Sequence, residues 1–220
     1  MRRIAEFQDS PLFAEIDGTK LENHLSNCSR KTFRKRETVF QPVEHKQFIY
    51  FLARGRLRVY VIHPDGQEFT VTVLEQGDVF SGHTRTFGKA LEECEVVLVP
   101  IQAFRSLVLE VPAISFRLAG VLGDSLKNTF TVIEKLAFKD VNERLRQFLV
   151  ETAEQRGRQT AEGISVDLGF NYQEIATLVG CSRQTVSAFF NGLQKQGILQ
   201  IDKKIVTMKD LPAFKANFFK

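Results

Sequence analysis

Residues 182–191 carry side chains of the types that recognise the edges of DNA bases. Arg183 and Gln184 are adjacent; an arginine fork matches O6 and N7 of guanine, and a glutamine amide pairs with adenine. Apolar residues around them recur at spacings of three and four, which predicts a helix over 183–196. These apolar residues are Val186, Phe189, Phe190 and Leu193. The residues on or near the opposite face, which is free to enter a groove, are Arg183, Gln184, Ser187 and Asn191.

A second, shorter helix is predicted immediately before this one, over 172–179, from its apolar residues Ile175, Ala176 and Leu178. Gly180-Cys181-Ser182 then forms a tight turn. The hydroxyl of Ser182 suits an N-cap, and the N-terminus of the helix that follows favours a phosphate. The pattern predicts a helix-turn-helix.

The residues after the second helix predict a wing. Gly197 ends the helix, and residues 198–206 alternate as a hairpin with a charged turn at Lys203 and Lys204. Both lysines are candidates for phosphate contacts. Without the hairpin, Arg183 and Gln184 could equally be surface residues of any helical pair; the hairpin favours a winged helix-turn-helix.

One long helix is predicted over 113–138, which contains no proline. Leu118, Leu122, Ser125, Thr129, Val132 and Leu136 recur along it at spacings of three and four. Such a stripe either packs on the chain's own β-domain or pairs with the same helix of a second copy. Its length favours a homodimer through residues 113–138, although Ser125 and Thr129 weaken the apolar seam.

A hinge is predicted between this helix and the next. Asp140 has the character of an N-cap for a helix over 141–155, which Gly157 ends. The hinge then lies at Phe138-Lys139-Asp140. We therefore expect three parts: an effector domain over 1–112, the dimerisation helix over 113–138 and a DNA-binding domain over 139–220.

The segment from Lys31 to Val99 predicts short strands. Leu57, Val59 and Val61 alternate with other residues, and a second alternating run follows the turn 63–66, which indicates a hairpin. Closely spaced strands with glycine turns favour a compact β-roll. The fold class is therefore α+β: an N-terminal β-roll, a long dimerisation helix and a C-terminal winged helix-turn-helix.

Composition is that of a folded protein of 220 residues, 43% hydrophobic and 25% charged. No apolar run reaches the roughly 18 residues of a membrane span, and no apolar region follows the basic N-terminus, so we expect a cytoplasmic protein. The net charge is +4, and residues 140–220 hold 11 Lys or Arg against 9 Asp or Glu. Charge alone is thus weak evidence for nucleic acid. No catalytic motif is present, so we expect no enzyme.

The order of elements and three motifs resemble the superfamily of the cyclic-AMP receptor and FNR, CRP/FNR. The motifs are Tyr172-x-Glu174-Ile175-Ala176, Gly180-Cys181-Ser182-Arg183-Gln184-Thr185-Val186 and Gly197-Ile198-Leu199. The resemblance covers nearly the whole chain. It implies a homodimer that binds double-stranded DNA at a palindromic operator and contacts RNA polymerase.

Two effectors of this superfamily do not match the sequence. Its cyclic-nucleotide binders resemble one another in a Gly-Glu pair followed by Arg-Ser-Ala or Arg-Thr-Ala, and residues 77–87 lack this pattern. An iron–sulfur cluster of the FNR type needs clustered cysteines, whereas Cys28, Cys94 and Cys181 are far apart.

Four stretches resemble the haem-containing carbon monoxide sensors of the CooA branch. They are 56–60, 77–83, 121–126 and 138–140. This resemblance implies haem b as cofactor, carbon monoxide as effector, activation of transcription and His83 as the proximal ligand of ferrous iron. The distal pocket that it implies is lined by Ala119, Leu122, Gly123 and Leu126.

Two positions depart from that branch. Ser81 stands where its members commonly have a cysteine ligand of ferric haem. The other axial ligand is an N-terminal amine; because Arg2 disfavours removal of the initiator, the candidate here is the amine of Met1, with its thioether as a second candidate. A β-roll that binds a small organic effector without haem stays an alternative, as does a helix-turn-helix that binds protein.

Overall fold

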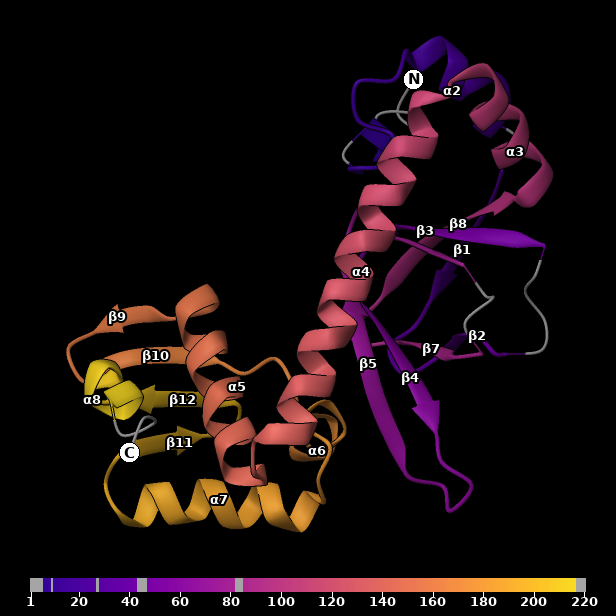
Figure 1. The fold of residues 1–220 in the computed structure, drawn as a ribbon. Helices are drawn as coiled ribbons and strands as arrows, with labels where there is room; N and C mark the ends of the chain where they lie inside the picture. Colours follow the sequence, from indigo (N-terminus) through magenta and orange to yellow (C-terminus); the bar gives the residue numbers. More distant parts are fainter. Residues whose placement is uncertain (1–5, 9, 27, 43–46, 82–84, 217–220) are drawn as a thin grey trace. The chain divides into compact units, whose positions relative to one another are not determined.

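The computed structural model describes residues 6–8, 10–26, 28–42, 47–81 and 85–216. The chain forms two compact units, Met1–Phe130 and Thr131–Lys220 (Figure 1).

The first unit contains the β-roll that the sequence predicts. One antiparallel sheet has the order β1-β8-β3-β6, and the other has the order β2-β7-β4-β5. The strands of the first sheet are β1 (Ser29–Phe33), β3 (Phe48–Arg54), β6 (Val79–Ser81) and β8 (Cys94–Pro100). Those of the second are β2 (Thr38–Phe40), β4 (Leu57–Ile62), β5 (Glu68–Leu74) and β7 (Phe87–Ala90). A cluster that includes Phe40, Leu52, Val59 and Val96 fills this part of the core.

The predicted hairpin is confirmed. Strands β4 and β5 pair in antiparallel register from Leu57 opposite Leu74 to Ile62 opposite Glu68. Gln67 closes the turn through its carbonyl, which accepts a hydrogen bond from the amide of His63.

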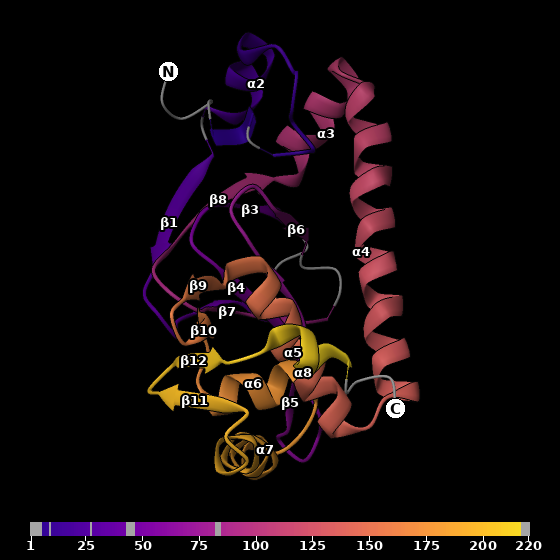
Figure 2. The same ribbon diagram turned by 90° about the vertical axis from the view of Figure 1, so that its left-hand side faces the viewer.

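Two helices beside the roll were not predicted: α2 (Gly18–Leu25) and α3 (Ile101–Glu110). They lie side by side in Figures 1 and 2. Phe7, Phe13, Leu21 and Leu107 are buried with them in a second cluster. They have 8 and 10 residues, and the contacts of their buried side chains with this cluster stabilise them.

Helix α4 (Ala113–Phe138) has the predicted bounds and is drawn as one unbroken helix in Figure 2. Ile114 is its buried residue, and several large apolar side chains farther along are exposed. In the described part of the chain no single helix has the length and hydropathy of a membrane span; α3 and α4 pass that test only as a pair, bent by 120°.

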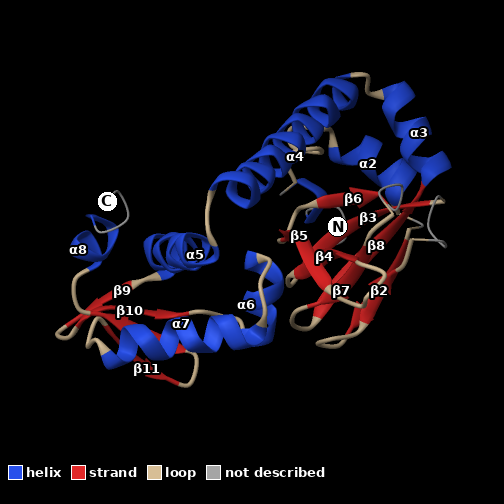
Figure 3. Ribbon diagram, turned by 60° about the horizontal axis from the view of Figure 1, so that its bottom comes forward, coloured by secondary structure: helices blue, strands red, loops and turns tan. Residues whose placement is uncertain are grey.

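The second unit is a helical domain with a small antiparallel sheet of order β11-β12-β10-β9 (Figure 3). Its helices are α5 (Val141–Arg156), α6 (Tyr172–Val179), α7 (Arg183–Lys195) and α8 (Leu211–Ala216). Its strands are β9 (Arg158–Thr160), β10 (Gly163–Asp167), β11 (Leu199–Asp202) and β12 (Ile205–Met208). Leu145, Leu149, Ile175, Val186 and Phe190 are fully buried at its centre.

Candidate nucleic-acid interface and effector domain

Helix α6 is fixed at both ends by local hydrogen bonds. The side chain of Asn171 accepts from the amide of Glu174 at 2.9 Å, and the Glu174 carboxylate accepts from the amide of Asn171 at 2.8 Å. This reciprocal capping box satisfies two amides that a helix leaves unpaired. At the other end Gly180 adopts φ 73°, a left-handed conformation that glycine takes without a steric penalty. The turn of the predicted helix-turn-helix is therefore built by Gly180.

Helix α7 presents the predicted polar residues to solvent. Ser182 is its N-cap and accepts from the amide of Thr185 at 3.1 Å, as predicted. Arg183, Gln184 and Asn191 are exposed, and Ser187 is half-buried beside Asn191. Val186, Phe190 and Leu193 face the core. The helix ends at Lys195, one residue before the predicted end, because Gln196 is its C-cap.

Arg144, on α5, connects the turn of the helix-turn-helix to the rest of the domain through hydrogen bonds. Its guanidinium donates to the carbonyls of Val179 at 2.9 Å, Gly180 at 3.2 Å and Lys139 at 2.7 Å. The first two carbonyls lie at the C-terminus of α6, and the third precedes α5. Sequence periodicity gave no signal for this residue, because its role depends on three carbonyls brought together by the fold.

The wing is the hairpin of β11 and β12, paired in register from Leu199 opposite Met208 to Asp202 opposite Ile205. Lys203 and Lys204 are its exposed turn. Lys203 has φ 56°, and the carbonyl of Lys204 accepts from the amide of Leu168 at 3.0 Å. The hairpin thus places both exposed lysines at the turn between β11 and β12.

The exposed face of α4 has a regular apolar pattern. Phe116, Leu126, Phe130 and Ile133 are each more than half exposed. Together with Ala119 and Gly123 they occupy positions 116, 119, 123, 126, 130 and 133, a heptad repeat of the kind that joins two helices. Leu118, which the sequence placed in the seam, is half-buried against the unit's own core.

Comparison with known proteins agrees with this architecture. Residues 30–110 match the cyclic nucleotide-binding domain, and residues 143–216 match the Crp-like helix-turn-helix domain. The cAMP-activated global transcriptional regulator CRP of Pasteurella multocida is 32% identical over 88% of this chain and 95% of its own. The chain belongs to the CRP/FNR family of transcription regulators. The predicted fold class and superfamily are therefore confirmed.

Other proteins similar to this chain are regulators with different names. A double mutant of CooA from Carboxydothermus hydrogenoformans has 35% identity and a TM-score of 0.80, covering 98% of this chain and 95% of that one. The global nitrogen regulator of Synechocystis is 28% identical over 96% of this chain and 97% of its own. CRP/FNR regulators bind DNA as homodimers and contact RNA polymerase. Family membership thus assigns the class of protein and leaves the effector open.

Both predicted iron ligands, His83 and Met1, lie outside the described part of the chain. The residues assigned to the distal pocket are on α4, where Leu122 and Leu126 are exposed to 60% and 55%. Ala119 and Gly123 are also exposed. Ala119, Gly123 and Leu126 are themselves heptad positions, and Leu122 is next to Gly123 in the helix.

The side chain of Asp78, in the turn before β6, forms a hydrogen bond with the backbone of the same turn. Its carboxylate accepts from the amide of Glu75 at 2.8 Å, and burial raises the pKa of Asp78 above its ordinary value. Because that hydrogen bond closes the turn, we assign Asp78 to the structure of the turn.

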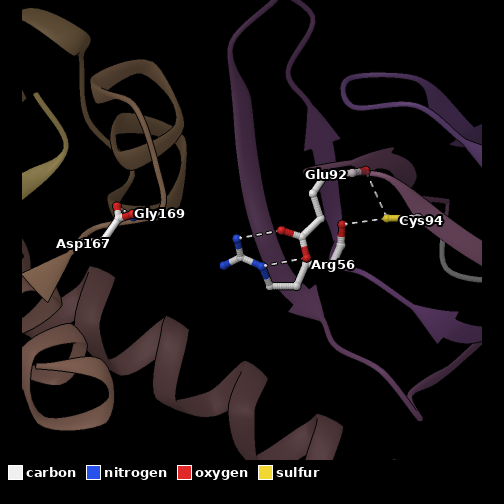
Figure 4. A network of polar contacts seen from close by, with 5 residues as sticks. All are labelled: Arg56, Glu92, Cys94, Asp167 and Gly169. Atoms are coloured by element: carbon white, nitrogen blue, oxygen red, sulfur yellow. Dashed lines mark hydrogen bonds and ion pairs between the residues drawn. The ribbon is translucent and has the colours of Figure 1, made fainter.

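The cysteines have the character of structural residues. Burial raises the pKa of Cys28, Cys94 and Cys181, so the thiols stay protonated at neutral pH. Cys94 is fully buried, and its Sγ donates to the carbonyl of Arg56 at 3.0 Å (Figure 4). Within the described ranges no group of three or more His, Cys, Asp or Glu residues is placed to hold a metal ion.

Proposed function

We propose that this CRP/FNR regulator is a haem-dependent, carbon monoxide-responsive activator of transcription. The observation that carries the proposal is the set of residues shared with the CooA branch, from 56–60 through 138–140, together with 35% identity to the CooA mutant over nearly the whole chain. The domain boundaries that we propose are 1–112, 113–138 and 139–220.

The described part of α4 suits a flat apolar group. Outside the backbone of the helix itself, an added Cβ at Gly123 would meet none of the described residues within 4 Å, and Leu122 and Leu126 on either side are exposed. The described residues therefore leave room for a macrocycle at that face. The proposal assigns His83 and Met1 as the residues that hold the iron, and Ala119, Leu122, Gly123 and Leu126 as the apolar wall.

Haem, when bound, would supply an iron that can bind carbon monoxide. The residues that follow Met1 then determine how a change of iron ligand at Met1 affects the rest of the protein. Phe7 is 2% exposed, with its ring 4.6 Å from that of Phe51, so the N-terminal segment is anchored in the core from Phe7 onward. The proposed response is a repacking of the α4 pair and a reorientation about Phe138-Lys139-Asp140.

In the DNA-bound form Arg183, Gln184 and Ser187 of each protomer read one half-site of a palindromic operator. Ser182, the N-cap of α7, and Asn191 flank them, and Lys203 and Lys204 contact phosphates. The exposure of all these side chains except the half-buried Ser187 supports the assignment.

An absorption spectrum of the purified full-length protein tests the proposal. Protein produced with ample haem should show a Soret band, and carbon monoxide should shift that band and increase operator affinity. His83→Ala should lose both responses. His63→Ala is the matched control, because His63 is an exposed residue of the β4–β5 turn, where it contacts Asp65 at 2.9 Å.

A colourless protein whose DNA affinity ignores carbon monoxide would refute haem sensing. The small organic effector is then the remaining candidate, and the match of residues 30–110 to the cyclic nucleotide-binding domain favours it as the second function. DNA binding itself would be unaffected by that outcome.

A further inference from the structure

An ion-pair bridge fixes the N-terminal segment to the first sheet of the β-roll. One guanidinium nitrogen of Arg30, on β1, contacts the carboxylate of Glu6 at 2.8 Å, and another contacts that of Glu95, on β8, at 2.6 Å. The side chain of Arg30 is 25% exposed, and those of Glu6 and Glu95 are 34% and 28% exposed. Because each side chain is more than half-buried, solvent ions screen this bridge less than a pair on the open surface.

Phe7 adds an apolar contact next to the bridge. Its ring centroid lies 4.6 Å from that of Phe51 and 5.5 Å from that of Phe13, and the residue is 2% exposed. The carbonyl of Phe7 accepts from the amide of Ser10 at 3.1 Å, so the backbone is held on this side as well. We call the residues of the bridge and this ring the N-terminal anchor: Glu6, Phe7, Arg30 and Glu95.

The N-terminal anchor borders a cavity of about 200 Å³. The residues that line this cavity are Phe7, Leu25, Ser26, Cys28, Arg30 and Val97. A side chain beside a cavity lacks packing contacts on that side, so Phe7 is held less firmly than a ring that the core encloses. Local opening costs least where packing is incomplete. We therefore expect the anchor to detach before the rest of the roll unfolds.

The position of the anchor in the sequence limits the reach of the N-terminus. Met1 lies five residues before Glu6, and five residues span at most about 17 Å. The local concentration of the end of a tether falls as about the −3/2 power of the tether's length. The next buried residue that the structure describes after Phe7 is Ser10. Release of the anchor therefore lengthens the tether from about five to about nine residues and lowers the local concentration of the amine about two- to threefold.

We propose that Arg30 is a positioning residue for the N-terminal iron ligand: through Glu6 it fixes the tether from which the amine of Met1 competes with carbon monoxide. The inference rests on the proposed function, because it takes haem as the cofactor and Met1 as an axial ligand. In this role Arg30 contacts neither the iron nor the gas. It adds a determinant of gas affinity on β1, outside α4.

Carbon monoxide titration of the haem-loaded, full-length protein measures this competition. Glu6→Lys places a like charge beside Arg30, and Phe7→Ala removes the aromatic contacts. The double variant should bind carbon monoxide about two- to threefold more tightly than wild type. Glu6→Lys alone keeps the aromatic contacts and should shift the affinity in the same direction. The spectrum of the carbonyl form should stay unchanged, because the gas has replaced the amine in that form.

Alkylation of Cys28 reports detachment of the anchor without any cofactor. Cys28 is half-buried and lines the cavity beside Phe7, and burial raises the pKa of its thiol. Because the thiolate is the nucleophile, release of the segment should speed the reaction of Cys28 with iodoacetamide, measured by mass on its peptide. Cys181, in the second unit, is the internal reference, and its rate should not change.

Matched variants separate the anchor from net charge and from tether length. Glu22→Lys makes the same change of charge at an exposed position on α2 and should behave as wild type in both measurements. Inverting all three charges, with Glu6→Lys, Arg30→Glu and Glu95→Lys, restores both ion pairs and should return both values toward wild type. Inserting Gly-Ser-Gly-Ser between Ala5 and Glu6 lengthens the tether with the anchor intact. It should raise gas affinity as the double variant does but leave the Cys28 rate unchanged.

Equal Cys28 rates in wild type and the double variant would overturn the proposal whatever the cofactor is, because the anchor would then not hold the segment. A faster Cys28 reaction with unchanged gas affinity would also overturn it, and would leave haem sensing in place. A colourless protein would refute the proposed function itself, and the role of Arg30 would fall with it.

Discussion

Replacing Arg144 by Met should destabilise the helix-turn-helix domain more than any exposed substitution. The guanidinium makes three hydrogen bonds to carbonyls, those of Lys139, Val179 and Gly180, at 2.7 to 3.2 Å. A hydrogen bond to a charged group contributes about 1.5–3 kcal/mol when buried. Arg144 is half-buried, so in the variant water can reach part of the space that the guanidinium leaves. We therefore expect the free energy of unfolding to fall by about 2–3 kcal/mol.

Thermal unfolding of the full-length protein measures this loss. For a domain of this size about 1 kcal/mol lowers the Tm by 4–8 °C, so the transition of the second unit should move down by roughly 10–20 °C. Because the chain has two units, hydrogen exchange of peptides from 139–196 assigns the transition to this domain. The transition of the β-roll should stay in place.

Two further variants sharpen the result. Arg144→Lys keeps the charge but has a single ammonium group, so it should restore only part of the stability. Lys195→Met changes an exposed cation of the same domain and should shift the Tm by less than about 3 °C, the effect of a surface substitution. If Arg144→Met lowers the Tm by no more than Lys195→Met does, the role assigned to Arg144 is wrong.

Three other outcomes follow from the geometry. Leu126→Glu with Phe130→Glu should dissociate the dimer in sedimentation, because the charges fall on the heptad seam; an unchanged dimer would contradict the seam. Arg183→Ala should reduce the free energy of operator binding by about 1–3 kcal/mol per half-site and relax base preference at one position. Lys203→Gly, which suits the φ of 56°, should weaken binding to operator and random duplex alike. Equal losses of affinity on both duplexes for Arg183→Ala would exclude base readout. Because the pKa of Asp78 is higher in the folded state, its contribution to stability is complete below pH 3.8 and is lost as the pH rises through the folded pKa. Asp78→Asn should remove this decline in a series of Tm values measured against pH. Parallel curves for wild type and variant would argue against the role of Asp78.

The sequence by itself determined the helix-turn-helix, the wing, the long helix and the β4–β5 hairpin. Each rests on local information: apolar periodicity, the caps Asp140 and Ser182, and glycines such as Gly180 at positive φ. The polar face of α7 followed from the same periodicity, because a helix with one buried side must expose the other.

Only the tertiary structure decided which side of α4 is free. Sequence periodicity placed Leu118 in the dimer seam, but the core of the first unit covers Leu118, whereas Phe116, Leu126, Phe130 and Ile133 are exposed. The role of Arg144 likewise depends on carbonyls that are 5, 35 and 36 residues away. Periodicity reports which side of a helix is apolar, but contacts between distant segments determine what covers it, and those contacts exist only once the chain has folded.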